Sequence, residues 1–206
     1  MGNLRSAQKG LERVGHEAVV TDDVSLIERA DGVVLPGVGA FKDCIEGLTE
    51  RGLVPVVKAA AASGKPFLGI CVGLQLLFEY GEEGAGAPGL GIFGGRVVRF
   101  ADASDTGLKV PHMGWNQIRP TDAPGARELL SLTTGTPYTY FVHSYFAKPT
   151  DPGIVLATCD YGISFPAIIG KDNVFATQFH PEKSQQAGLA ILKAFGNKVA
   201  STAGVG

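Results

Sequence analysis

Two short motifs, far apart in the chain, hold a cysteine, a histidine and a carboxylate. Gly69-Ile70-Cys71-Val72-Gly73 follows one apolar run, and Gln178-Phe179-His180-Pro181-Glu182 follows another. A thiol becomes an effective nucleophile when a histidine takes its proton and a third group fixes the tautomer of that histidine. The motifs therefore predict nucleophilic catalysis by Cys71, with His180 as the base and Glu182 as the group that orients it.

Each of these motifs also has a plain structural interpretation. The first has the form of a nucleophile elbow, in which glycines let a strand turn sharply into a helix whose N-terminus stabilises a thiolate. A buried cysteine at a glycine-punctuated strand end fits the same residues. His180 could be a structural histidine at a strand-ending turn, with Glu182 at the surface. The proline between them, however, makes a stiff turn that can hold the carboxylate against the imidazole.

A third glycine-rich segment, Pro36-Gly37-Val38-Gly39-Ala40-Phe41, ends another apolar run. Ligands of open α/β sheets gather at the carboxyl ends of parallel strands. A backbone N–H of Val38 or Gly39, together with that of Val72, is therefore expected to form an oxyanion hole. An ordinary strand-to-helix turn is the alternative.

The composition is typical of one α/β domain over residues 1–206. The chain is 45% hydrophobic and 18% charged, with a formal net charge of -2 and a pI near 6.1. Because no block of like charges occurs, nothing electrostatic favours a nucleic acid or an anionic membrane as a partner. A small-molecule substrate or a protein partner is the better expectation.

The three cysteines, Cys44, Cys71 and Cys159, show no metal-type spacing. Neither a disulfide framework nor a zinc site is expected, and no other metal or organic cofactor is implied. The sequence has no apolar stretch near the roughly 20 residues of a membrane-spanning helix, and no signal-peptide pattern opens it. We therefore expect a reduced, cytoplasmic protein.

Apolar periodicity predicts alternating strands and helices in the first half and short antiparallel strands in the second. The alternation favours a mostly parallel central sheet flanked by helices in flavodoxin-like layers, with a small antiparallel portion. Helices are expected over residues 3–14, 42–50, 53–62, 72–80 and 183–199, with 199–206 as a frayed tail. Strands are expected over residues 18–20, 32–35, 66–70, 96–100, 138–145, 154–159, 165–169 and 174–179.

The two catalytic motifs resemble those of the class I (triad) glutamine amidotransferases, and the likeness extends over nearly the whole chain. It narrows to the branch of this family that serves histidine biosynthesis, because four blocks occur in the same order. These blocks are Pro36-Gly37-Val38-Gly39-Ala40-Phe41, Pro111-His112-Met113-Gly114-Trp115-Asn116, Phe141-Val142-His143-Ser144-Tyr145 and Gln178-Phe179-His180-Pro181-Glu182-Lys183-Ser184.

The resemblance implies a glutaminase. Cys71 would attack the carboxamide of glutamine to form a thioester, and His180, oriented by Glu182, would protonate the departing ammonia and activate water. The α-amino and α-carboxylate groups of glutamine would be held by Gly39, Gln75, Glu83, His143, Ser144 and Tyr145. For residues 143–145 a polar strand end is the alternative.

In that branch the ammonia passes through a channel into a (β/α)8-barrel synthase subunit, which forms imidazole glycerol phosphate and an aminoimidazole carboxamide ribonucleotide. The resemblance therefore implies a heterodimer, with Asn3, Met113, Trp115, Tyr140 and Lys183 facing the partner. Trp115 could instead pack in the core. A free-standing cysteine hydrolase of the same fold, such as a γ-glutamyl hydrolase or a peptidase-like protein, would need no partner, and the Trp115 block and Lys183 argue against it.

The chain departs from the family at its start. Relatives usually open with a strand and a glycine-rich turn before the first helix, whereas this sequence begins at Met1-Gly2-Asn3-Leu4, inside that turn. We therefore expect the first strand of the sheet to be absent from this chain, and attribute this to a start codon assigned too late.

Overall fold

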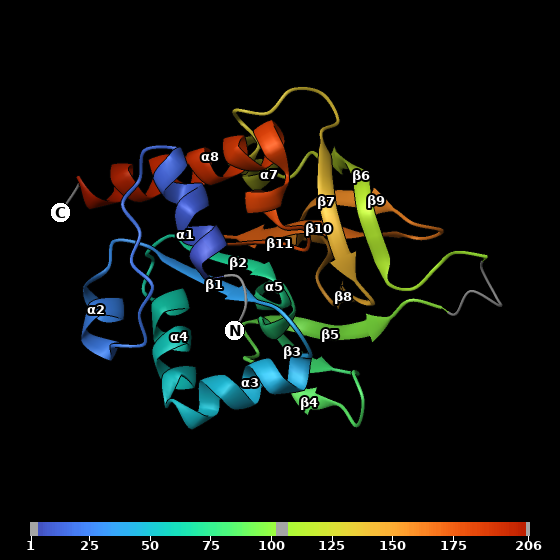
Figure 1. The fold of residues 1–206 in the computed structure, drawn as a ribbon, viewed down its shortest axis with the longest axis horizontal. Coiled ribbons are helices and arrows are strands. Elements are labelled where there is room, and N and C mark those ends of the chain that lie inside the picture. Colours follow the sequence, from blue (N-terminus) through green and yellow to red (C-terminus); the bar gives the residue numbers. More distant parts are fainter. Residues whose placement is uncertain (1–3, 102–106, 205–206) are drawn as a thin grey trace.

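The computed structural model describes residues 4–101 and 107–204 (Figure 1). The helices are α1 (Leu4–Arg13), α2 (Val24–Arg29), α3 (Phe41–Glu50), α4 (Leu53–Ala62), α5 (Val72–Leu76), α7 (Pro124–Leu129) and α8 (Gln185–Ala203), with two 3-10 turns, η1 (Pro152–Ile154) and η2 (Pro181–Lys183). The strands are β1 (Val33–Gly37), β2 (Phe67–Cys71), β3 (Phe78–Gly81), β4 (Ala87–Pro88), β5 (Phe93–Arg99), β6 (His112–Pro120), β7 (Tyr138–His143), β8 (Tyr145–Pro149), β9 (Val155–Asp160), β10 (Ser164–Lys171) and β11 (Val174–Thr177).

Seven strands form a mixed central sheet in the order β1-β2-β11-β10-β9-β6-β7, and four form a second sheet in the order β4-β3-β5-β8. The α/β class is confirmed. Within the central sheet, parallel pairing is limited to β1, β2 and β11, and the other neighbours are antiparallel. The antiparallel portion is larger than expected because short turns join β9 to β10 and β10 to β11, and such turns can link only antiparallel neighbours.

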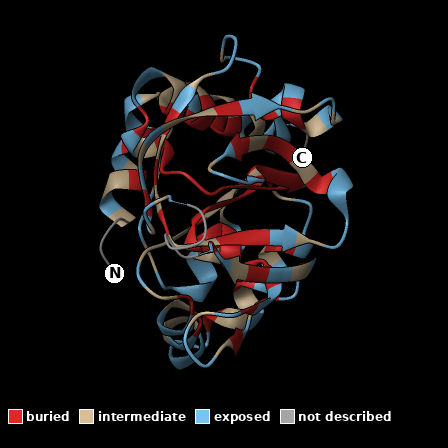
Figure 2. Ribbon diagram, turned by 90° about the vertical axis from the view of Figure 1, so that its right-hand side faces the viewer, coloured by how far each residue is buried: buried red, intermediate tan, exposed pale blue. Residues whose placement is uncertain are grey.

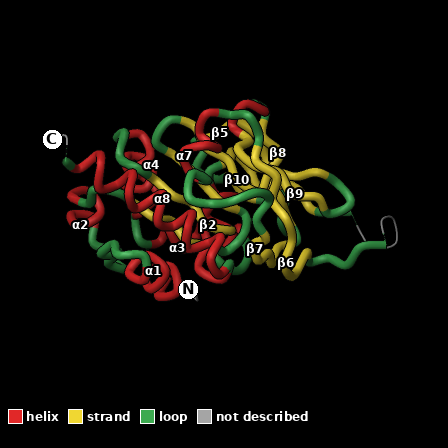
Figure 3. The backbone as a smooth tube through the Cα atoms, turned by 90° about the horizontal axis from the view of Figure 1, so that it is seen from above, coloured by secondary structure: helices red, strands yellow, loops and turns green. Residues whose placement is uncertain are grey.

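Helices cover both faces of the parallel part of the sheet, while β6 and β7 project beyond them (Figures 1 and 3). On one face α1 packs on α8, burying Ala7 and Leu11 at helical spacing. On the other face α4 buries Leu53, Val57 and Ala61, which recur every four residues. These periodicities made both helices predictable from sequence.

The expected helix over residues 72–80 is wrong beyond Leu76. The chain leaves the helix there and forms β3, which pairs with β4 and β5. The carbonyl of Leu76 accepts the N–H of Leu90, and the carbonyl of Leu77 accepts those of Ile92 and Phe93. These long-range bonds satisfy the carbonyls that a continuing helix would have used, so tertiary contacts override the local preference.

Other boundaries also differ from expectation. Residues 18–20 form no strand, and Val19 is 67% exposed. Strand β1 lies at the edge of the central sheet, and β2 is its only partner within residues 4–101 and 107–204, so residues 18–20 do not pair with it. An isolated strand has no ladder to stabilise it. Strand β6 was not predicted, because its glycine-containing sequence did not indicate a strand. Pairing with both β7 and β9 stabilises it. Helix α8 continues to Ala203, so residues 199–203 are helical.

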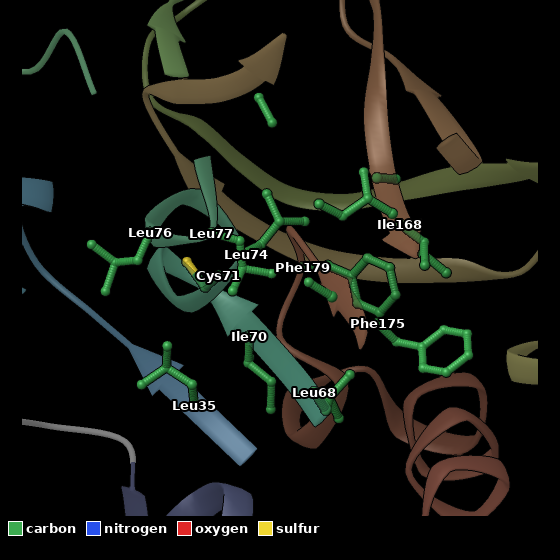
Figure 4. Packing of buried hydrophobic residues seen from close by; sticks show 14 of the residues in the cluster. Leu35, Leu68, Ile70, Cys71, Leu74, Leu76, Leu77, Ile168, Phe175 and Phe179 are labelled. Atoms are coloured by element: carbon green, nitrogen blue, oxygen red, sulfur yellow. The ribbon is translucent and has the colours of Figure 1, made fainter. Parts of the chain in front are cut away.

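Buried residues gather in the middle of the fold (Figure 2), and residues of β2 belong to this hydrophobic cluster (Figure 4). All five residues of this strand are buried, and Leu68 and Ile70 are among the most fully buried side chains of the protein. A strand buried on both faces is typical of parallel sheets covered by helices. The carboxyl end of β2, where Cys71 lies, is therefore held by close packing. None of the helices in the described ranges is long and apolar enough to cross a membrane.

Candidate active site

Cys71 lies at a sharp turn between β2 and α5. Its backbone has φ 56° and ψ -111°, a strained conformation for a residue with a side chain. The flanking glycines are required sterically, since a Cβ on Gly73 would lie 1.9 Å from the Leu35 carbonyl oxygen and one on Gly69 would lie 2.9 Å from the Gly73 carbonyl oxygen. The nucleophile-elbow interpretation is thus favoured over that of a structural cysteine.

His180 follows β11 and faces Cys71 from the neighbouring strand. Its Nδ1 lies 2.9 Å from Glu182 Oε1, and the two side chains are 2% and 1% exposed. Burial by itself lowers the pKa of His180, but hydrogen bonds to Cys71 and Glu182, and the charges of both, raise it to about 9. A protonated His180 is the partner that a Cys71 thiolate needs, and the buried carboxylate excludes the surface-turn interpretation of Glu182.

The glycine-rich segment after β1 reaches the same place. Gly37 is the register partner of Cys71, and a Cβ on Gly37 would lie 2.8 Å from the Gly73 nitrogen. Gly39 has φ +94°, which only glycine adopts readily. The parallel pairing therefore carries Val38 and Gly39 to the side of Val72, where the oxyanion hole was predicted. Their role as donors stays a prediction.

One contact to this loop was not anticipated. The thiol of Cys44 in α3 donates to the Val38 carbonyl oxygen at 3.3 Å. Burial raises the pKa of Cys44, so the thiol keeps the proton it donates. No feature of the sequence around Cys44 indicated this role, because the contact depends on where α3 turns back on the loop.

The predicted glutamine-binding residues approach the elbow from three segments. Gln75 lies in α5, and its Nε2 donates to the Tyr145 carbonyl oxygen at 3.0 Å. Glu83 follows β3 and accepts the backbone N–H of Phe41 at 2.6 Å, which places its carboxylate beside the loop that contains Gly39. Ser144 and Tyr145 are half-buried at the end of β7 and the start of β8. Their contacts with glutamine stay predictions.

The ring of His143 makes hydrogen bonds inside the protein. The ring is 6% exposed, its Nδ1 lies 2.8 Å from the Tyr145 carbonyl oxygen and its Nε2 lies 3.0 Å from His112 Nδ1. Both nitrogens are therefore engaged inside the protein. A direct contact between the ring and glutamine would require one of these bonds to break, and the contact of His143 with glutamine stays a prediction.

The predicted interface residues gather beside His180. Met113 and Trp115 on β6 are 62% and 46% exposed, so the interpretation of Trp115 as a core residue is wrong. The Trp115 and Tyr140 rings lie 6.0 Å apart, and Lys183 Nζ lies 6.0 Å from the Tyr140 ring. The backbone N–H of His180 donates to the Tyr140 carbonyl at 3.0 Å, which joins this cluster to the site. Asn3 lies outside the described residues.

The described part of the chain has no group of three or more His, Cys, Asp or Glu side chains that could hold a metal ion. The arrangement of Cys71, His180 and Glu182 is instead that of a covalent catalytic triad. A sequence model of class-I glutamine amidotransferases matches residues 3–199.

The chain belongs to this family.

Relatives of this amidotransferase include two proteins named imidazole glycerol phosphate synthase subunit HisH. The one from Syntrophotalea carbinolica is 54% identical over 200 residues, covering 96% of each chain. The one from Rhodopirellula baltica is 53% identical over 195 residues, covering 95% of this chain and 92% of its own. Among solved structures, a glutamine amidotransferase shares the fold with a TM-score of 0.71 at 21% identity, over 95% of each chain.

Proposed function

We propose that this amidotransferase is the glutaminase subunit of imidazole glycerol phosphate synthase. The observation that carries the proposal is the buried Cys71–His180–Glu182 group at a strained elbow, in a chain that is 54% identical to a protein named as that subunit. Glutamine is the substrate, and glutamate and ammonia are the products.

The reaction proceeds in two halves. The Cys71 thiolate attacks the carboxamide carbon, and backbone N–H groups of Val72 and of Val38 or Gly39 stabilise the oxyanion. His180 gives its proton to the leaving nitrogen, the C–N bond breaks and ammonia departs. His180 then takes a proton from water, the hydroxide attacks the thioester, and the C–S bond breaks to release glutamate. Glu182 holds the imidazole through Nδ1 in both halves.

The partner is a (β/α)8-barrel synthase subunit that consumes the ammonia. The cluster supplies the exposed side chains of Met113, Trp115 and Lys183 and the half-buried ring of Tyr140, which are aromatic, thioether and cationic groups of the kind that anchor protein interfaces. Their position beside His180 supports a docking surface close to the point where ammonia is released, from which ammonia would enter the partner without crossing bulk water.

The test uses the reconstituted complex. Cys71→Ala should abolish glutamine-dependent synthesis and leave synthesis from ammonium salts intact, because only the ammonia source is removed. Loss of ammonium-dependent synthesis from a correctly assembled complex would contradict the assigned role of Cys71. High glutamine hydrolysis by the isolated wild-type chain would favour a free-standing hydrolase instead.

A further inference from the structure

A buried amide contacts the nucleophile and has no part in the mechanism above. Gln178 is fully buried, and its Nε2 lies 3.9 Å from Cys71 Sγ. The Cys71 side chain is itself only 4% exposed, so water offers few hydrogen bonds to a thiolate at this position. A buried anion depends on donors from the protein, and a donor to a charged group is worth more than one to a neutral group.

The contacts of Gln178 determine which end of its amide faces the sulfur. Gln75 Nε2 donates to the Tyr145 carbonyl oxygen, which can only accept, so the orientation of the Gln75 amide is settled. The same Nε2 lies 3.1 Å from Gln178 Oε1 and donates to it. The Gln178 carbonyl is thereby occupied, and its NH2 group points to Cys71.

A second run of hydrogen bonds reaches the same Tyr145 carbonyl from β6, with its donors directed toward that oxygen. The Tyr145 carbonyl also accepts from His143 Nδ1, so His143 carries its proton there and its Nε2 accepts from His112 Nδ1. His112 Nε2 in turn accepts from Asn116 Nδ2 at 3.2 Å. Burial lowers the pKa of His112 to about 4 and that of His143 to about 3, which keeps both rings neutral with these tautomers.

We propose that Gln178 is a further catalytic residue, whose amide N–H donates to the Cys71 thiolate, and that Gln75, His143 and His112 are positioning residues that hold the amide in this orientation. This run of hydrogen bonds extends from β6, the strand that also carries Trp115, to the reacting sulfur. This inference rests on the proposed glutaminase activity of the same site.

The first test replaces the donor. In the reconstituted complex, Gln178→Leu should lower kcat/KM for glutamine hydrolysis by about 10- to 100-fold, chiefly through kcat, as expected for the loss of a hydrogen bond to a charged group. Gln178→Glu should be equally impaired at alkaline pH and should exceed the Leu variant as the pH falls, because a protonated carboxyl can donate again. A parallel pH profile for both variants would overturn the donor role.

Alkylation provides a readout that does not depend on turnover. The rate at which iodoacetamide modifies Cys71, followed by peptide mass, should reach half its plateau at a higher pH in Gln178→Leu than in the wild type. Gln117→Glu makes the same chemical change as Gln178→Glu at a half-buried position on β6, where the side chain bonds to Thr136, and should alter neither assay. An unshifted alkylation profile in Gln178→Leu would refute the inference.

The positioning residues are tested through coupling. His112 stacks on Phe141 and Tyr161, with ring centroids 4.8 and 4.1 Å away, so His112→Phe keeps the packing and removes only the hydrogen bonds. We expect it to lower kcat by about 3- to 10-fold, comparable to one neutral hydrogen bond, and to add little once Gln178 is Leu. Fully multiplicative effects would refute the positioning role.

Far-ultraviolet circular dichroism like that of the wild type, and co-elution of each variant with the barrel subunit in size-exclusion chromatography, show that folding and assembly are intact. If the wild-type complex did not hydrolyse glutamine at all, the proposed function would fail rather than the role of Gln178, and the alkylation profile would still decide that role.

Discussion

Acid should destabilise the protein through His112 and His143. The loss of stability should begin at a higher pH than the titration of carboxylates alone would give. Burial lowers the pKa of His112 from 6.5 to about 4 and that of His143 to about 3. The unfolded chain therefore binds protons below pH 6.5 that the folded protein does not bind. The stability contributed by neutral burial is present above that pH and is lost as the pH falls toward the folded pKa values.

The size of the effect follows from these values. Between pH 7 and pH 5 an unfolded histidine of pKa 6.5 gains about 2 kcal/mol of proton binding, while the folded His112 and His143 gain almost none. Together they should lower the free energy of unfolding by about 4 kcal/mol. His180, whose pKa is raised to about 9, acts in the opposite direction over this range and offsets about 1 kcal/mol, leaving a net loss of about 3 kcal/mol.

Urea unfolding at pH 7, 6 and 5, followed by far-ultraviolet circular dichroism, measures this loss directly. His112→Phe retains the ring stack and removes one of the two titrating groups, so its loss between pH 7 and 5 should be about 2 kcal/mol smaller than that of the wild type. A wild-type loss below about 1 kcal/mol, or the same pH dependence in His112→Phe, would show that the buried rings are not neutral in the way we infer.

Three further variants test the site. Gly73→Ala should lower the free energy of unfolding by at least about 3 kcal/mol or prevent folding, since its Cβ would overlap a backbone oxygen at 1.9 Å. Gly47→Ala, in an open part of α3, should leave the stability unchanged or raise it slightly in the same thermal unfolding assay. Glu182→Gln should lower glutaminase kcat/KM by about 100-fold. It should also move the alkaline limb of the pH profile to lower pH, because it removes the negative charge of Glu182 that raises the pKa of His180. An unmoved limb would contradict the pairing of His180 with Glu182. Cys44→Ala should lower the free energy of unfolding by about 1 kcal/mol by removing the hydrogen bond to the half-buried Val38 carbonyl. An unchanged urea midpoint would show that this contact is not formed in solution.

The elbow illustrates what was predictable. The strand, the turn and the glycines of residues 69–73 are contiguous, and the steric demand that makes them glycines acts within the turn and against β1 next to it. Periodic apolar residues placed α1, α4 and α8 for the same reason, since a helix presents residues three and four apart to one neighbour. The segment after Leu76 was mispredicted because its carbonyls bond to residues 90–93, which no local pattern reveals.

The amino-acid sequence by itself determined the chemistry of this protein: a cysteine nucleophile, a histidine with its carboxylate, and membership of a family of glutamine amidotransferases. These features depend on residue types within short segments, where covalent connection fixes the geometry. Tertiary structure alone decided which groups meet across the chain. In the folded protein Trp115 is exposed beside His180, both nitrogens of His143 make hydrogen bonds, and the amide of Gln178 lies against Cys71. Gln178 lies 107 residues from Cys71 in the chain, and only the packing of β11 against β2 brings its hydrogen-bond donor to the sulfur.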